Sequence, residues 1–226
     1  MRILNCITDF NHYFSAQTLH PQVAVAELFR ADFSLFDTKV YDLYALIMID
    51  GVFGELIRDG KPLPYTKGSL VTIRPGQSIE MKMDYTTKPQ GWMLAFKPEL
   101  LEKTGLGRDF YMFSYFNSDY SEAIRLTDME YGVIKNCFAN LYAELNTPKD
   151  HLSGQMIRLG IGTLLSYVKR YFEKQHTISV RSSETLVGKL DTLLDRYLGS
   201  GLPAQHGQPT VTWCATQFNL SPNYFG

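Results

Sequence analysis

The sequence lacks several features that would assign it to a class at once. It has only three cysteines in 226 residues, far apart and odd in number: Cys6, Cys137 and Cys214. That number and spacing argue against a disulfide framework and a cysteine-based zinc site, and they indicate reduced thiols in a cytoplasmic protein. No apolar run approaches the roughly 18–20 residues of a membrane span, and the first residues do not form a signal peptide. We therefore expect a cytoplasmic protein without a membrane partner.

Positive charge and catalytic motifs are also scarce. The net charge is −1, and no Lys or Arg lies between Arg196 and Gly226. A complete DNA-binding domain usually has a basic surface, and the chain as given has none. It contains no nucleophile elbow, phosphate-binding glycine loop or Cys/His metal spacing, and its five histidines are scattered. Glu55 and Glu80 show no sign of converging, so we expect neither an enzyme nor a bound cofactor.

What the sequence does contain, from about residue 40 to residue 97, is a series of short apolar segments separated by turn signals. Asp59-Gly60 predicts a two-residue hairpin, because a type I′ turn needs positive φ at both positions. Pro75-Gly76 marks a second turn. The expected strands are residues 43–49 and 52–58, a glycine-started strand within KGSLVTIRPGQ that ends at the Pro75-Gly76 turn, and residues 78–84 and 92–96. Strands of this kind with one apolar face predict a small antiparallel β-barrel or jelly roll.

One strand alternates clearly and predicts the inside of the barrel. Residues 78–84 place Ile79, Met81 and Met83 on one face and polar residues on the other. We expect a mainly apolar effector pocket inside the barrel, with Arg74 either as an anion anchor or as a solvated arginine at the rim. The candidate pocket residues are Tyr44, Phe53, Arg74, Ile79, Met81, Met83 and Trp92.

Residues 67–79, KGSLVTIRPGQSI, resemble the second motif of the cupin barrel, in which a glycine and a P-x-G turn precede a metal-binding histidine. Here the first proline is replaced by Arg74 and the histidine by Ile79. The first cupin motif, H-x-H with a later glutamate, is absent. The resemblance therefore implies a cupin-like barrel, and the substitutions predict that it is metal-free.

After Pro98 the sequence is helical in pattern. Thr127-Asp-Met-Glu130 is a capping box, and apolar residues then step by three and four to residue 145. A second helix is expected from about 151 to 173, and a short loop makes the two an antiparallel hairpin. Glycines at 154, 160 and 162 indicate a close approach of another helix.

The second helix is apolar around most of its circumference, so it must be covered on two sides. Either a partner subunit covers one side, which predicts a homodimer, or the helix is enclosed within its own subunit. The candidate interface residues are Ile134, Phe138, Leu141, Met156, Leu159, Thr163 and Tyr167.

The last part of the chain reads as a polar linker at 175–183, a helix at 184–198, and a helical corner at 211–226. Asn219-Leu220 can form the turn of the corner, because Asn tolerates the left-handed conformation. A serine and a proline then cap and begin another helix. This arrangement predicts a helix-turn-helix. Its key residues are Ala215, Leu220, Ser221, Pro222, Asn223 and Tyr224.

Residues 214–226, CATQFNLSPNYFG, resemble the first helix-turn-helix of the arabinose-regulator (AraC/XylS) family of bacterial transcription factors. In that family an N-terminal effector-binding and dimerisation domain precedes the DNA-binding domain. The resemblance implies an α+β chain with a cupin-like, effector-binding barrel at 1–100, a helical dimerisation region at 101–177, and the truncated start of a DNA-binding domain at 183–226. It also implies that residues 1–37 form an N-terminal arm and the first strands.

The partners expected from this resemblance are a second copy of the chain, an unknown small-molecule effector, and DNA for the full-length parent but not for this fragment. An alternative hypothesis remains. The chain could be a stand-alone, metal-free, cupin-like protein that binds small molecules, or a divergent enzyme. A basic stretch of about seventy residues with a second helix-turn-helix, encoded directly downstream, would decide for the regulator.

Overall fold

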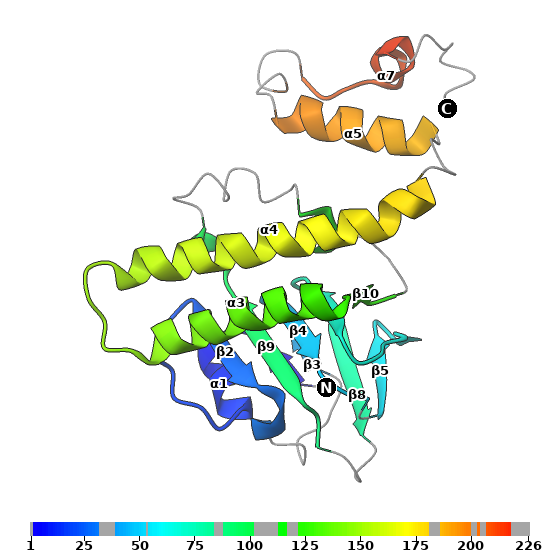
Figure 1. The fold of residues 1–226 in the computed structure, drawn as a ribbon. Helices are drawn as coiled ribbons and strands as arrows, with labels where there is room; N and C mark the ends of the chain where they lie inside the picture. Colours follow the sequence, from blue (N-terminus) through cyan, green and yellow to red (C-terminus); the bar gives the residue numbers. More distant parts are fainter. Residues whose placement is uncertain are drawn as a thin grey trace. The chain divides into compact units, whose positions relative to one another are not determined.

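The computed structural model describes residues 2–31, 39–52, 54–83, 88–101, 113–116, 122–180, 186–199, 203 and 207–217 (Figure 1). The chain divides into two compact units, Met1–Gln175 and His176–Gly226. The first unit contains two β-sheets and two long helices. The described residues of the second unit include two shorter helices.

The first sheet of the first unit has the strand order β1-β3-β8-β5-β6. Its strands are β1 (Arg2–Leu4), β3 (Lys39–Tyr41), β5 (Gly54–Arg58), β6 (Lys61–Pro62) and β8 (Ser78–Met83). β1 and β3 are parallel, and the other pairs are antiparallel. The predicted hairpin between β5 and β6 is confirmed, since Asp59 has φ of 50° and Gly60 has φ of 75°.

The second sheet has the order β10-β7-β4-β9-β2, and all of its pairs are antiparallel. Its strands are β2 (Val23–Glu27), β4 (Tyr44–Ile49), β7 (Ser69–Ile73), β9 (Gly91–Phe96) and β10 (Ile124–Arg125). β4 lies in the middle, paired with β7 on one side and β9 on the other. This sheet is buried on both faces, because side chains of β2, β4, β7 and β9 belong alternately to two different cores.

The core between the two sheets contains side chains from both of them together with the aromatic residues of a short helix, α1 (Ile7–Tyr13). Phe10 is completely buried there, and Phe14 directly follows the helix. The sequence did not predict α1, because the family resemblance implied an arm and strands for residues 1–37. Ile7, Phe10, Tyr13 and Phe14 recur at spacings of three and four, and this places them on one face of a helix.

The second core lies between the second sheet and a helical hairpin of α3 (Asp128–Asn146) and α4 (Ser153–Val180). Figure 1 shows α3 and α4 running side by side beyond the strands. The predicted capping box of α3 is confirmed, with both of its bonds between Thr127 and Glu130 present. The predicted close approach is also confirmed at Gly160, where an added Cβ would lie 2.8 Å from Cδ2 of Leu141.

Helix α4 is longer than the sequence predicted. A polar linker was expected at 175–183, but α4 extends to Val180. The segment from Gln175 to Val180 contains no Pro or Gly, so no local signal ends the helix before that point.

The α+β class and the antiparallel sheets are confirmed by the structure. In the part of the chain that it describes, the strands form two separate sheets and no hydrogen-bonded pair joins one sheet to the other. A closed barrel needs a continuous ladder of strands, so the expected barrel is not closed in these residues. The cupin-like jelly roll stays a prediction.

The second unit contains α5 (Leu186–Gly199) and α7 (Val211–Gln217). The Tyr197 hydroxyl donates to the carbonyl of Gly207 at 3.0 Å, and the Tyr197 ring lies 4.5 Å from the Trp213 ring. Thr210 caps α7, since its hydroxyl accepts from the backbone N–H of Trp213 at 3.1 Å. An aromatic pair and a hydrogen bond to the loop between them thus help to connect the two helices.

Candidate functional site

The structure separates the predicted effector-pocket residues into two layers. Ile79 and Met81 are buried in the core between the sheets. Tyr44 and Trp92 lie on the opposite face of the second sheet and pack against the helical core. The four side chains therefore do not line one common cavity. Because β4 and β9 are apolar on both faces, their sequences gave no sign of which face each side chain takes.

The aromatic pair at this second layer has well-defined neighbours. The Tyr44 ring stacks on Phe96 at 5.7 Å and meets Phe116 edge-on at 4.9 Å. Trp92 meets Tyr142 of α3 edge-on at 5.3 Å. Burial raises the pKa of Tyr44, and the nearby positive charge of Arg74 opposes that rise. Arg74 is therefore close to Tyr44, although Tyr44 faces away from Ile79.

Two further candidates of this set lie outside the described residues: Phe53 entirely, and Met83 in its side chain. Among the described residues, neither the groove on α4 nor the cavity beside the α1–β2 segment is lined by Ile79 or Met81. Ile79 and Met81 are packed core residues, and the pocket between the sheets stays a prediction.

Exposed side chains form a row along the outward face of α4, starting at the residue just before the helix. We call this row the outer stripe, and it consists of three apolar residues and one threonine: Leu152, Met156, Leu159 and Thr163. Met156 is 53% exposed and Leu159 is 58% exposed. An open groove of about 300 Å³ continues from the stripe along the helix. It is lined by Leu159, Gly162, Thr163, Ser166, Tyr167 and Arg170. The Arg170 guanidinium lies over the Tyr167 ring at 5.5 Å, which gives the groove a cationic and aromatic end.

The predicted interface residues of α3 are placed differently. Ile134, Phe138 and Leu141 are buried in the core of their own subunit and are not available to a partner. The opposite face of α4 is buried as well, through Ile157, Ile161, Leu164, Leu165 and Val168. Of the predicted interface set, only Met156, Leu159, Thr163 and Tyr167 on α4 reach the surface.

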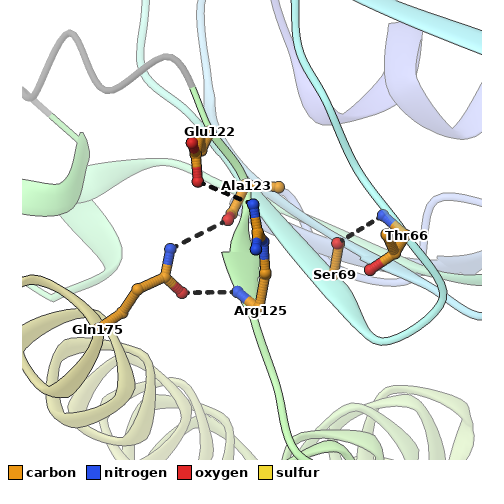
Figure 2. Close-up of polar contacts among 6 residues, drawn as sticks. All are labelled: Thr66, Ser69, Glu122, Ala123, Arg125 and Gln175. Carbon is orange, nitrogen blue, oxygen red and sulfur yellow. Dashed lines mark hydrogen bonds and ion pairs between the residues drawn. The ribbon is translucent and has the colours of Figure 1, made fainter.

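The last turn of α4 in the first unit is held by a side-chain clasp that the sequence did not reveal. The Gln175 carboxamide oxygen accepts from the backbone N–H of Arg125 at 2.8 Å, and its nitrogen donates to the carbonyl of Ala123 at 3.4 Å (Figure 2). β10 is the edge strand of the second sheet. The Gln175 side chain therefore forms hydrogen bonds that the backbone of a neighbouring strand would otherwise form. The Arg125 side chain forms an ion pair with Glu122 at 3.1 Å.

A second contact holds the same turn. The Lys174 ammonium pairs with Glu130 at 2.8 Å, and Glu130 also accepts from the backbone N–H of Thr127 at 2.9 Å. Burial alone would raise the pKa of Glu130, but the hydrogen bonds from Lys174 and Thr127 and the charge of Lys174 together lower it. The turn of α4 that ends the first unit is thus tied to both α3 and the second sheet.

A cavity of about 200 Å³ lies beside the segment that joins α1 to β2. It is enclosed by that segment, by the edge strand β2 and by the end of α3. Its lining residues are Asn11, Ser15, Ala16, Gln17, Leu19, Val23, Ala24, Val25, Arg30, Tyr142, Leu145 and Asn146. None of them was predicted as a site residue, because they come from three separate segments without a motif.

In the second unit, Ala215 of α7 is completely buried, and its neighbour Cys214 is almost so. A small buried residue in this helix agrees with the expected helical corner. The other predicted residues of the helix-turn-helix, Leu220 to Tyr224, lie outside the described residues.

Among the described residues, no group of three or more His, Cys, Asp or Glu side chains could hold a metal ion. None of the described helices has the length and apolar character needed to cross a membrane.

Comparison with known proteins gives little. No protein-family model matches the chain, and no curated protein matches it. Among solved structures, the crystal structure of the AraC-like transcriptional activator CuxR matches with a TM-score of 0.38 and 11% sequence identity. The match covers 80% of this chain, which spans 58% of the CuxR chain. So low a score does not establish a shared fold, and the proposals below rest on the residues of this chain.

Proposed function

We propose that this chain is the ligand-sensing and dimerising portion of an AraC-type transcriptional regulator and is not an enzyme. The observation that carries the proposal is the outer stripe of α4. Single exposed apolar residues are common on protein surfaces, but a contiguous exposed apolar patch marks an interaction site. The occupant that we propose is the same stripe of a second copy, because a two-fold interface brings identical surfaces together.

The course of α4 supports a regulatory use of such a dimer. The helix carries the outer stripe at its start and continues without interruption to Val180, where the second unit has already begun. Pairing through α4 would therefore bring two copies of the second unit into one assembly. Regulators with a helix-turn-helix generally bind DNA as dimers, with one reading helix for each half-site. In this proposal, the capped helix α7 with its buried Ala215 is the first helix of the helix-turn-helix.

The sensing part of the proposal concerns a small-molecule effector. Of the predicted pocket residues, Ile79 and Met81 lie in the core between the sheets, and Tyr44 and Trp92 lie on the other face of the second sheet. The proposed effector site is the one at Ile79 and Met81. Binding between the sheets would require some of the packed core to open. If core side chains move to admit a ligand, they would displace strands of the second sheet. Because this sheet contributes side chains to both cores, the displacement would reach the helical hairpin as well.

The experiment that tests the dimer is light scattering of the 226-residue chain and of Leu159→Glu. A stable interface buries more than roughly 1,000 Å². We expect the unmodified chain to be a dimer and Leu159→Glu to be a monomer with an unchanged far-ultraviolet circular dichroism spectrum. Asn140→Glu on the exposed face of α3 is the matched control and should remain a dimer. If light scattering shows that the unmodified chain is a monomer, the proposed interface is wrong.

The regulatory role is tested separately in cells. Residues 1–180 would be fused to a DNA-binding domain that represses a reporter only when it is dimerised. We expect repression with the unmodified sequence and its loss with Leu159→Glu. Repression that is unaffected by Leu159→Glu would show that this helix face does not join the two copies.

A further inference from the structure

The cavity beside the α1–β2 segment has room for a ligand that is smaller than a drug molecule. Its volume of about 200 Å³ lies below the roughly 300–1,000 Å³ typical of sites for drug-sized ligands. One wall is apolar, with Val23, Leu145 and the ring of Tyr142. The other wall is polar and includes Asn11, a side chain that is only 4% exposed. A small molecule with both an apolar and a polar end fits these two walls.

The polar wall has hydrogen-bonding groups that its own neighbours leave unused. The Asn11 amide nitrogen donates to the Thr18 hydroxyl at 3.2 Å, and among the described residues the carboxamide oxygen has no hydrogen bond. β2 is an edge strand, and the carbonyl of Gln22 accepts from Lys97 on the β9 side at 2.9 Å. Alternation along an antiparallel ladder then turns the backbone N–H of Val23 and Val25 away from β9, towards the cavity side.

Positive charge gathers around this cavity. Arg30 lines it, and its Nε pairs with Glu27 at 2.9 Å. Among the described residues, no other hydrogen bond to its remaining guanidinium N–H groups occurs. Lys149 donates to the carbonyl of Leu19, which also lines the cavity. Burial lowers the pKa of the adjacent His20, and the positive charges of Lys149 and Arg158 lower it further.

The nearest carboxylate in sequence, Asp150, forms no ion pair with these groups among the described residues. Its Oδ1 accepts from the backbone N–H groups of Leu152 and Ser153 at 2.8 and 2.9 Å, at the start of α4. With Glu27 opposite Arg30, the positive charges of Lys149 and Arg158 are left without a carboxylate partner in the described part of the chain. An anionic ligand would supply such a partner.

We propose that this cavity is a binding site for a small organic monocarboxylate. The carboxylate lies towards Arg30 and Lys149, and the apolar body lies against Val23, Leu145 and the Tyr142 ring. A hydroxyl on the ligand donates to the free oxygen of Asn11. The site connects the α1–β2 segment to the end of α3, and it stands whether or not the chain regulates transcription.

The experiment uses the full 226-residue chain and two probes, 4-hydroxybenzoate and hexanoate. Calorimetric titration at low ionic strength should show saturable binding of at least one probe. The uncharged analogues, 4-hydroxybenzyl alcohol and hexanol, should bind at least about tenfold more weakly, because each lost charge-assisted bond costs about a factor of ten or more. Amide shifts in ¹H–¹⁵N spectra should be confined to residues 11–30 and 142–149.

Substitutions locate the site. Arg30→Gln and Lys149→Gln should each weaken binding by about tenfold. Gln17→Glu, an exposed and nearly isosteric change in the lining, should weaken it similarly by adding a negative charge. Lys67→Gln, which removes a positive charge paired with Asp50 elsewhere, should leave binding unchanged. The proposal is overturned if neither probe binds, if the alcohols bind equally well, or if the three site variants bind like the unmodified chain.

Discussion

The side chain of Gln175 pairs with the backbone of Arg125 as one β-strand pairs with another. Its carboxamide accepts from the Arg125 N–H at 2.8 Å and donates to the carbonyl of Ala123, two residues earlier on the same edge (Figure 2). Through this pairing, the last residue of the first unit completes the edge of the second sheet. Any change that moves the end of α4 must break these two hydrogen bonds or carry β10 along with it.

We predict that Gln175→Ala lowers the free energy of unfolding of the first unit by about 1–2 kcal/mol, since two hydrogen bonds are lost. Urea unfolding followed by circular dichroism measures the change. Gln155→Ala, an exposed position on the same helix, is the matched control for the altered helix propensity. Hydrogen exchange at the Arg125 amide should accelerate only in the first variant. Equal stabilities of the two variants would contradict the role assigned to Gln175.

A pH dependence is expected from Glu130. Its pKa is lowered in the folded state, so the stability that it contributes is present above the unfolded pKa of about 4.3 and is lost as the pH falls through the folded pKa. Glu130→Gln keeps the acceptor of the capping box but removes the ion pair with Lys174. We predict a loss of less than about 1 kcal/mol at neutral pH, because Lys174 is largely exposed.

Unfolding curves of Glu130→Gln and the unmodified chain at neutral pH and near pH 3 check this prediction. The difference between the two proteins should disappear at the lower pH. A difference that stays constant over this range would assign the effect to packing and not to charge.

Two glycines should respond in opposite ways to substitution by alanine. Gly91 has φ of 135°, and an added Cβ would lie 2.0 Å from the carbonyl oxygen of Met48. Gly91→Ala should therefore destabilise the protein by about 3 kcal/mol or more. Gly132 lies within α3 with nothing near its Cβ position, so Gly132→Ala should stabilise by about 0.5–1 kcal/mol. Thermal unfolding of both variants decides the point, and a tolerated Gly91→Ala would show that β9 can move away from β4.

The position of Ile79 predicts a protein without a stoichiometric metal. Ile79 stands where the cupin motif has a metal-binding histidine, and its side chain is buried among apolar neighbours. An alkyl side chain offers no ligand to a metal ion. Elemental analysis of purified protein should find iron, zinc and manganese well below one equivalent per chain. One equivalent of any of them would refute this prediction.

The 226-residue chain is predicted not to bind DNA specifically. Base readout needs side chains of a reading helix in the major groove, and affinity needs several Lys or Arg contacts to phosphates. The sequence has no Lys or Arg from Tyr197 to Gly226. A mobility-shift assay with promoter DNA from the neighbourhood of the gene should show no specific complex at physiological salt. A sequence-dependent shift would point to a DNA-contacting surface elsewhere on the chain.

The strands and helices set by local signals were predictable. The hairpin at Asp59-Gly60 and the capping box of Thr127 and Glu130 are defined by residues next to one another, and both occur as expected. Alternation in β8 placed Ile79 and Met81 on a buried face. In each case the physical cause acts within a few residues, so the sequence alone reveals it.

Features set by distant contacts were not predictable. The parallel pairing of β1 with β3 joins segments about 37 residues apart, as Arg2 faces Lys39. Helix α1 has Cys6 as its N-cap residue, and the Cys6 side chain forms no capping hydrogen bond, so no N-cap signal in the sequence marks the start of the helix. On α4, both faces are apolar, and the sequence did not show that the face with Leu159 would lie outward while the face with Leu164 is buried. The cavity at Arg30 combines three segments and has no motif.

Because β4 is buried on both faces, a contrast between a wet and a dry face does not fix its register. In a sheet with one wet face, a one-residue slip exposes apolar side chains and is strongly disfavoured. A slip of β4 would instead exchange Leu46 and Met48, which face the helices, with Ala45 and Ile47, which face the other sheet. Both sets are apolar, so the exchange alters the fit of side-chain volumes and leaves polarity unchanged. Alignment of the central strand is thus enforced by steric fit and by its two hydrogen-bonded neighbours.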